Sequence, residues 1–277
     1  MIVSPFTPLF FNSFRKADGI DSDYVQTFAP TDRILLELLG GSDMTANAKV
    51  LLEPSGAVLY ELDFNKWDIN SEARLLFTTI SLAPGCYSVQ IDGIGKSEPF
   101  IVTDDERILD GTTLIQYSMK DNRQRNDAVF FIDGMQYFFD FRVPGGFKDS
   151  NWSFSVESEQ FVTPYSDISQ LFGLESTQKR FTLGNSSGVP VWFGEMLNRI
   201  LVCSHVYFDG VKFSRKESNV PELAVQLEGV NSFVFTQTLQ QSVNLDPVIE
   251  SNNHLCMRRV NGDDYRAITS ILNRIIE

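Results

Sequence analysis

The chain has 277 residues, of which 43% are hydrophobic, so it can bury the core of one large domain or two ordinary ones. Its 36 acidic residues outnumber 23 basic ones, and the formal net charge of −13 argues against direct binding to nucleic acid or to an anionic membrane surface. Two histidines and three cysteines are too few for a disulfide framework or a His-rich metal site.

Residues 1–11 are predicted to form an extended N-terminal arm. Pro5 and Pro8 disfavour a helix, and the segment has neither the basic start nor the cleavage site of a signal peptide. Because no apolar run approaches the ~20 residues of a membrane helix, we expect a soluble protein made in a cytoplasm. The arm either packs on its own domain or inserts into a neighbouring subunit. In the second case its assembly contacts are Phe6, Leu9, Phe10 and Phe11.

Residues 12–105 are predicted to form a β-sandwich domain. Apolar and polar residues alternate over Tyr87–Asp92, which is typical of a half-buried antiparallel strand. Asp92-Gly93 follows and suits a type I′ hairpin turn. The polar stretch Thr103–Gly111 is the best candidate for a domain boundary.

Residues 112–250 are predicted to form a second β domain. Alternation recurs at 136–143, and again where Trp152, Phe154 and Val156 are expected to face the core. Further strand-like runs and two more Asp-Gly turn signals follow the same pattern: Val202–Phe208, Val211–Phe213, Leu223–Leu227, Asp133-Gly134 and Asp209-Gly210. The fold class is therefore all-β, with two antiparallel sandwich or barrel-like domains.

Helical signals are few. A short helix is predicted over residues 189–201, with Pro190 in its first turn and an apolar stripe of Phe193, Met196, Leu197 and Ile200. Residues 251–277 are predicted to be a linker and a C-terminal helix, whose assembly contacts are Ile268, Leu272 and Ile275. A third, weaker candidate is Tyr165–Leu174.

The residues that suggest catalysis have simpler structural interpretations. Gly184–Gly188 matches the Gly-x-Ser-x-Gly elbow around Ser186, with His254 downstream, but the chain lacks an alternating strand–helix pattern and the pentapeptide also suits a polar turn. Cys203 and His205 would share one face of a predicted strand among core residues. Asp18–Asp23 lacks the closing glutamate of a calcium loop. We therefore assign no catalytic, cofactor-binding or metal-binding residues and expect no enzyme.

A carbohydrate-binding β-sandwich is the alternative function. Such modules stack sugars on exposed aromatic rings, and the chain has three tryptophans, at 67, 152 and 192. Trp67 is the tryptophan flanked by polar residues, in Asn65-Lys66-Trp67-Asp68. Loss of glycan binding in Trp67→Ala would support this alternative.

Several stretches, in their order and spacing, resemble tail-region structural proteins of phages and prophages of Bacteroidetes hosts. They are Phe28–Ile34, Leu82–Tyr87, Ser97–Phe100, Gly188–Trp192, Leu197–Leu201, Val206–Phe213 and Val220–Glu222. The resemblance implies a virion component near the tail tip or baseplate, assembled in the host cytoplasm, with no catalytic residues to carry over. It also implies contacts with other tail proteins and with further copies of the chain, in a homo-oligomer that closes into a ring where the rotation permits.

Overall fold

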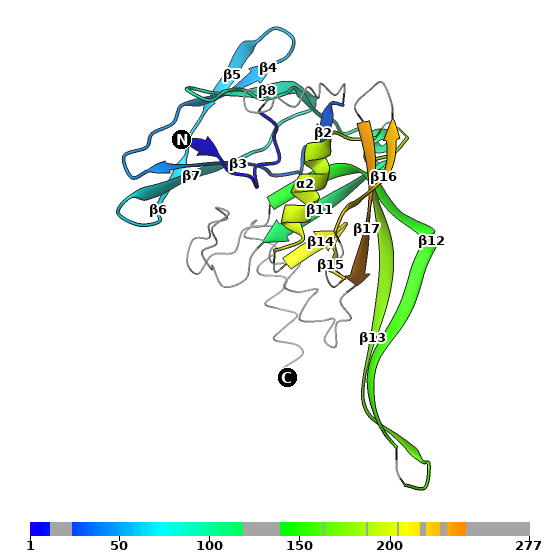
Figure 1. The fold of residues 1–277 in the computed structure, drawn as a ribbon. Helices are drawn as coiled ribbons and strands as arrows, with labels where there is room; N and C mark the ends of the chain where they lie inside the picture. The colour runs from blue at the N-terminus through cyan, green and yellow to red at the C-terminus, as the bar shows by residue number, and fades with distance from the viewer. Residues whose placement is uncertain are drawn as a thin grey trace, which may run out of the picture.

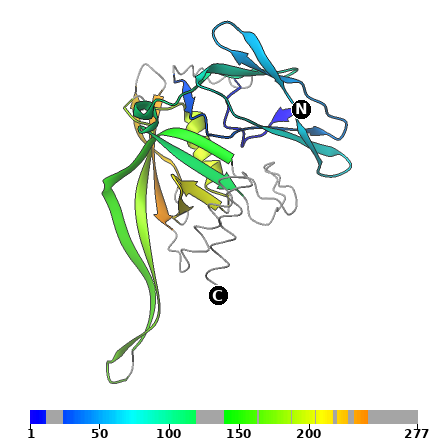
Figure 2. The same ribbon diagram turned by 180° about the vertical axis from the view of Figure 1, so that it is seen from behind.

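The structure is a computed structural model that describes residues 1–11, 24–118, 139–162, 164–186, 188–203, 205–216, 220–227 and 232–241. The described chain is all-β, as predicted, with two helices, α1 (Glu106–Leu109) and α2 (Val191–Ile200), beside its sheets (Figures 1 and 2). The predicted C-terminal helix, with Ile268, Leu272 and Ile275, lies outside the described residues, as do Asp18–Asp23, Asp133-Gly134 and His254.

The N-terminal part is a sandwich of two sheets. One has the order β1-β3-β7-β6, and the other the order β2-β10-β8-β4-β5 with β9 paired to β8. A shared core joins the two layers, for example through Leu36 of the first sheet and Val89 of the second. The strands are β1 (Ile2–Val3), β2 (Gln26–Phe28), β3 (Ile34–Gly41), β4 (Ala48–Leu52), β5 (Ala57–Leu62), β6 (Asn65–Asp68), β7 (Ala73–Ile80), β8 (Gly85–Ile91), β9 (Gly95–Lys96) and β10 (Phe100–Val102).

The C-terminal part is a closed antiparallel barrel. Its strands are β11 (Thr112–Ser118), β12 (Phe139–Val162), β13 (Ile168–Leu183), β14 (His205–Phe208), β15 (Val211–Arg215) and β17 (Ser232–Gln241), with β16 (Glu222–Leu227) added beside β17. The pairing of β13 with β17 closes the ring of strands. Closure of the ring removes most of the sheet edges. Helix α2 buries Phe193 and Leu197 in the same core as Phe181 and Phe208.

The predictions of α2 and of the Asp209-Gly210 turn hold, whereas others fail. Asp92-Gly93 does not form the expected type I′ turn, because Gly93 has a positive φ and Asp92 does not. The predicted helix over 189–201 is present as α2, and Pro190 is its N-cap residue. Asp209 and Gly210 both have positive φ, 47° and 85°, as a type I′ hairpin turn requires. The helix suggested over Tyr165–Leu174 is wrong, because Ile168 begins β13 and pairs with Val162 of β12. Strand pairing overrides a helix-like spacing of apolar residues there.

The N-terminal arm packs on the chain's own domains. Its β1 pairs with β3, and the Ser4 amide donates to the carbonyl of Glu37 at 2.8 Å. Phe6, Leu9 and Phe11 are buried, and the half-buried Phe10 stacks on the Trp192 ring at a centroid distance of 5.5 Å. Burial within the chain leaves these side chains little surface for a partner, so the structure shows the first alternative for the arm rather than insertion into a neighbour.

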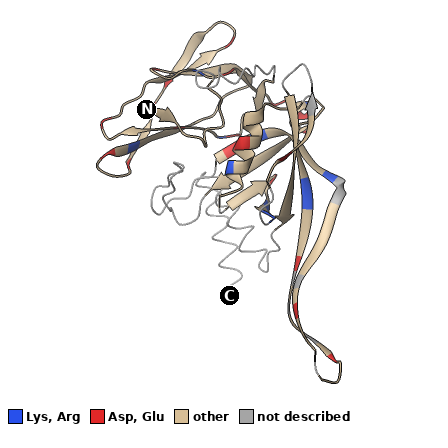
Figure 3. Cartoon of the chain, in the orientation of Figure 1, with Lys and Arg blue, Asp and Glu red and all other residues tan. Residues whose placement is uncertain are grey.

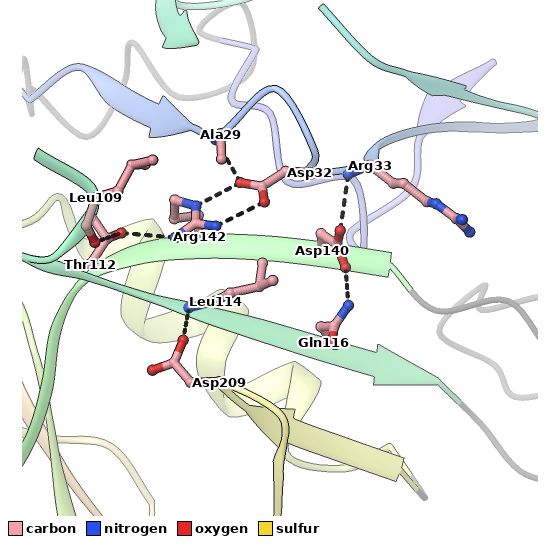
Figure 4. A network of polar contacts seen from close by, with 10 residues as sticks. All are labelled: Ala29, Asp32, Arg33, Leu109, Thr112, Leu114, Gln116, Asp140, Arg142 and Asp209. Atoms are coloured by element: carbon pink, nitrogen blue, oxygen red, sulfur yellow. Dashed lines mark hydrogen bonds and ion pairs between the residues drawn. The ribbon is translucent and has the colours of Figure 1, made fainter. Parts of the chain in front are cut away.

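A buried polar network joins the sandwich to the barrel (Figure 4). The guanidinium of Arg142, on β12, donates two hydrogen bonds to the carboxylate of Asp32, at 2.6 and 2.9 Å. The Asp32 side chain is fully buried and that of Arg142 is 11% exposed. Two residues away on β12, Asp140 accepts hydrogen bonds from the Arg33 amide and from Gln116. These bonds fix the first residues of β12 against the sandwich.

Candidate assembly surface

Strands β12 and β13 continue beyond the barrel as a projecting two-stranded hairpin (Figures 1 and 2). The pairing of β12 with β11 ends at Pro144, and the pairing of β13 with β17 ends at Thr177. Further out, the two strands are paired with each other as far as Val162 and Ile168. Within the described residues, both outer edges of this hairpin are unpaired, so backbone donors and acceptors there are available to another chain.

The root of the hairpin is formed by a glycine and a bulge. Gly145 has a φ of 126°, and an added Cβ would collide with the carbonyl oxygen of Thr182. Only glycine suits such a backbone at such a close approach. A register shift between Phe147 and Trp152 then introduces extra residues into β12, a local irregularity that bends a strand. These features direct the hairpin away from the barrel wall.

The face of the hairpin that continues the barrel interior is apolar and exposed. Lys179 is two residues before the fully buried Phe181 on β13, so both side chains are on the core-facing side of the sheet. Trp152 pairs with Lys179, so the Trp152 side chain is on the same side. Nevertheless Trp152, Phe154 and Val156 are 47%, 77% and 62% exposed. The expectation that these three residues face the core is therefore wrong, because β12 has already parted from its neighbour β11, whose pairing with it ends at Pro144. Other apolar residues of the hairpin are also exposed: Phe161, Val162, Tyr165, Ile168 and Leu171.

The opposite face near the root is held by hydrogen bonds between the strands. The hydroxyls of Ser155 and Ser176 are 2.7 Å apart, and the amide of Gln178 donates to Ser155 at 3.0 Å. Such cross-strand pairs stabilise a two-stranded ribbon, which is marginal in water by itself. Near its root, the hairpin therefore has one polar, internally bonded face and one face that presents Trp152, Phe154 and Val156, with Glu175 paired to Val156.

A lysine lies between the aromatic side chains of the barrel and the first aromatic side chain of the exposed face. The Nζ atom of Lys179 lies 3.9 Å from the ring centroid of Trp152, and 5.7 Å from that of Phe213 in the barrel. Cations bind the faces of aromatic rings, most strongly that of tryptophan. This contact fixes the first aromatic side chain of the exposed face against the barrel.

The described residues that were considered for catalysis lie in two connecting segments of the barrel and at the start of one strand, whereas His254 lies outside the described residues. Gly184 and Gly188 have positive φ, 94° and 68°, and this turn joins β13 to α2 with Asn185 and Ser186 exposed. Cys203, in the turn after α2, and His205, the first residue of β14, are both half-buried, so the two do not share a strand as expected. In the described part of the chain, no group of three His, Cys, Asp or Glu side chains is arranged to hold a metal ion. None of its helices is long and apolar enough to cross a bilayer.

The three tryptophans lie on three separate elements. Trp67, on β6, and Trp192, on α2, are both half-buried against the barrel core, whereas Trp152 is exposed on the hairpin. Trp67, the residue expected to stack a sugar, is thus engaged in packing rather than presented on an open sheet.

Comparisons with known proteins identify no family. No family model matches the chain, and no curated protein matches it. Among solved structures, the ZIG-8–RIG-5 IG1-IG1 heterodimer matches 30% of this chain and 85% of its own at 11% identity, with a TM-score of 0.18. The complex of Dpr2 Ig1-Ig2 with DIP-Theta Ig1-Ig3 matches 82% of this chain and 90% of its own at 10% identity, with a TM-score of 0.17. At such low TM-scores these similarities carry no argument about function.

Proposed function

We propose that the chain is a non-enzymatic assembly subunit of a phage or prophage tail, in the region of the tail tip or baseplate. It acts through protein–protein contacts with copies of itself and with other tail proteins, in a virion assembled in the host cytoplasm. The observation that carries this proposal is the exposed apolar face of the β12–β13 hairpin.

Three physical points support an assembly role for the hairpin. A contiguous apolar face that the chain leaves in water is typical of a protein-binding surface. Full burial of a side chain such as Phe154 or Val156 contributes about 1.5–3 kcal/mol, and aromatic residues dominate such contacts. The unpaired hairpin edges can also add strands from another chain. The resemblance to tail-region proteins and the net charge of −13, which suits a subunit near DNA, support a contact within a tail.

The proposal predicts that polar substitutions on the hairpin prevent association without unfolding the protein. Phe154→Ser combined with Val156→Ser removes two exposed side chains from the centre of the apolar face. We expect at least a tenfold weaker association of the variant with itself or with tail proteins encoded by adjacent genes, measured by sedimentation velocity after co-expression. The circular dichroism spectrum should be unchanged, because both side chains are exposed.

A matched control is available on β5. Val58 and Leu59 are 54% and 50% exposed on a strand of the sandwich, so Val58→Ser with Leu59→Ser removes a similar apolar area elsewhere. This control should assemble normally. Equal loss of association in both variants, or in neither, would contradict the proposed role of the hairpin.

A further inference from the structure

We propose that the hairpin docks on a second copy of this chain, with the acidic outer part of one hairpin lying against the basic root of the next. This inference rests on the proposed function and names the partner of the same surface. It follows from the way in which charge is distributed along the hairpin.

Acidic and basic residues are separated along the two strands (Figure 3). Residues 150–178 contain four acidic residues, at 157, 159, 167 and 175, and no lysine or arginine. The root instead contains Lys148, Lys179 and Arg180, with Asp149 as its acidic residue. The outer part therefore carries a formal charge of −4 and the root a formal charge of +2.

The charged side chains on both sides of this division are available to a partner. Glu159 and Glu175 are exposed on the outer part, and Lys148 and Arg180 are exposed at the root. Along β13, Glu175 lies four residues from Lys179, or about 13 Å at 3.3 Å per residue. On β12, the level of Lys179 is marked by its pairing partner Trp152. Glu159 lies seven residues from Trp152, or about 23 Å by the same rise.

This separation makes a staggered contact between two copies favourable. Two hairpins that point the same way and lie side by side at the same level would place like charges opposite one another, which is destabilising. A shift of about 13–23 Å along the hairpin places the acidic part of one copy beside the basic root of its neighbour. The exposed apolar side chains, such as Phe154, then supply affinity, while the charges fix the level at which the copies meet.

The same arrangement favours another copy over an unrelated partner. A generally basic protein would complement the outer part alone and would meet like charge at Lys148 and Arg180. Each copy of this chain instead carries both the acidic part and the basic root, so one contact leaves the basic root of one copy and the acidic part of the other available for further copies. Repetition of such a heterologous contact builds a ring or a filament.

Charge reversal tests this inference in the full chain. The first variant combines Glu159→Lys and Asp167→Lys with Glu175→Lys, which changes the formal charge of the outer part from −4 to +2. The second combines Lys148→Glu with Arg180→Glu, which changes that of the root from +2 to −2. We expect each variant alone to self-associate at least tenfold more weakly than the wild type, measured by sedimentation velocity in low salt. An equimolar mixture of the two variants, and a single chain with all five substitutions, should associate within about threefold of the wild type, because opposite charges face one another again.

The outcomes separate this inference from the proposed function. Undiminished self-association of both variants, or no recovery in the mixture, would overturn the staggered contact, while loss of association in Phe154→Ser with Val156→Ser would still support the hairpin as the assembly surface. A wild-type chain that stays monomeric but binds another tail protein through the hairpin would also overturn the staggered contact. If substitutions on the hairpin affect no association at all, both proposals fail. Circular dichroism verifies that each variant is folded.

Discussion

Phe181→Ala is expected to lower the free energy of unfolding by about 3–5 kcal/mol, the usual cost of deleting a buried aromatic ring. Phe181 lies on β13 inside the barrel, where it is fully buried. Its ring centroid is 4.9 Å from that of Phe208 and 5.2 Å from that of Phe147. Its removal leaves a cavity between strands whose pairing closes the barrel. Urea denaturation followed by circular dichroism measures the effect.

Phe154→Ala is the matched control for this prediction. Phe154 belongs to the same hairpin and is the same residue type, but its side chain is 77% exposed. We expect its free energy of unfolding to change by no more than about 0.5 kcal/mol. Similar destabilisation by both substitutions would mean that the outer hairpin packs on the chain itself, contrary to the structure.

The stability of the protein is expected to depend on the ionisation of Glu37, which is fully buried in the middle of β3. Burial raises the pKa of its carboxyl from 4.5 to about 8, although a hydrogen bond with Ser4 opposes the shift. Between these two values, the unfolded chain has released a proton that the folded chain still holds. Rising pH therefore favours unfolding, by up to about 1.4 kcal/mol per pH unit for this one group. Below pH 4.5 both states hold the proton, and above pH 8 the effect levels off.

Glu37→Gln isolates this contribution, because glutamine keeps the shape of the side chain and a hydrogen-bonding oxygen but does not ionise. The variant should gain stability relative to the wild type as the pH rises from 5 to 8, measured by urea denaturation at each pH. A difference between the two proteins that stays constant across this range would show that Glu37 is already ionised in the folded state. The backbone of the same residue holds the arm, since the Glu37 amide donates to the Thr7 hydroxyl and the Glu37 carbonyl accepts from the Ser4 amide.

The elements that sequence predicts correctly are those specified by local chemistry. The alternation of Tyr87–Asp92 corresponds to β8, and the Asp209-Gly210 pair adopts the positive φ values that its turn needs. The apolar spacing after Pro190 corresponds to α2. In each case the preferred conformation depends on residues within a few positions, and the tertiary structure agrees with it.

The candidate site was not predictable in the same way. Trp152, Phe154 and Val156 alternate with polar residues exactly as a core-facing strand does, so periodicity assigns them to the interior. Whether such a face is covered depends on how far the neighbouring strands extend, and β11 pairs with β12 only as far as Pro144. No local pattern in residues 150–178 distinguishes this exposed face from a buried one.

The arm is the converse case. Its apolar residues were candidates for contact with a partner, and in the structure they are buried within the chain. Phe6 packs in the barrel core, and its carbonyl accepts a hydrogen bond from the Tyr117 hydroxyl at 2.6 Å. This contact joins residues that are 111 positions apart in the chain. No local pattern in residues 1–11 specifies such a partner, and the sequence therefore left both packing on the chain's own domain and insertion into a neighbour open.

Hydrogen exchange of the wild-type protein below and above its association concentration tests most directly whether the hairpin is the assembly surface. The unpaired edges of β12 and β13 should exchange rapidly in the dilute subunit and become protected on association. We predict protection in peptides covering residues 152–177, with no change over β5 at residues 57–62. Protection confined to other parts of the chain, with the hairpin exchanging at the same rate in both samples, would contradict this account.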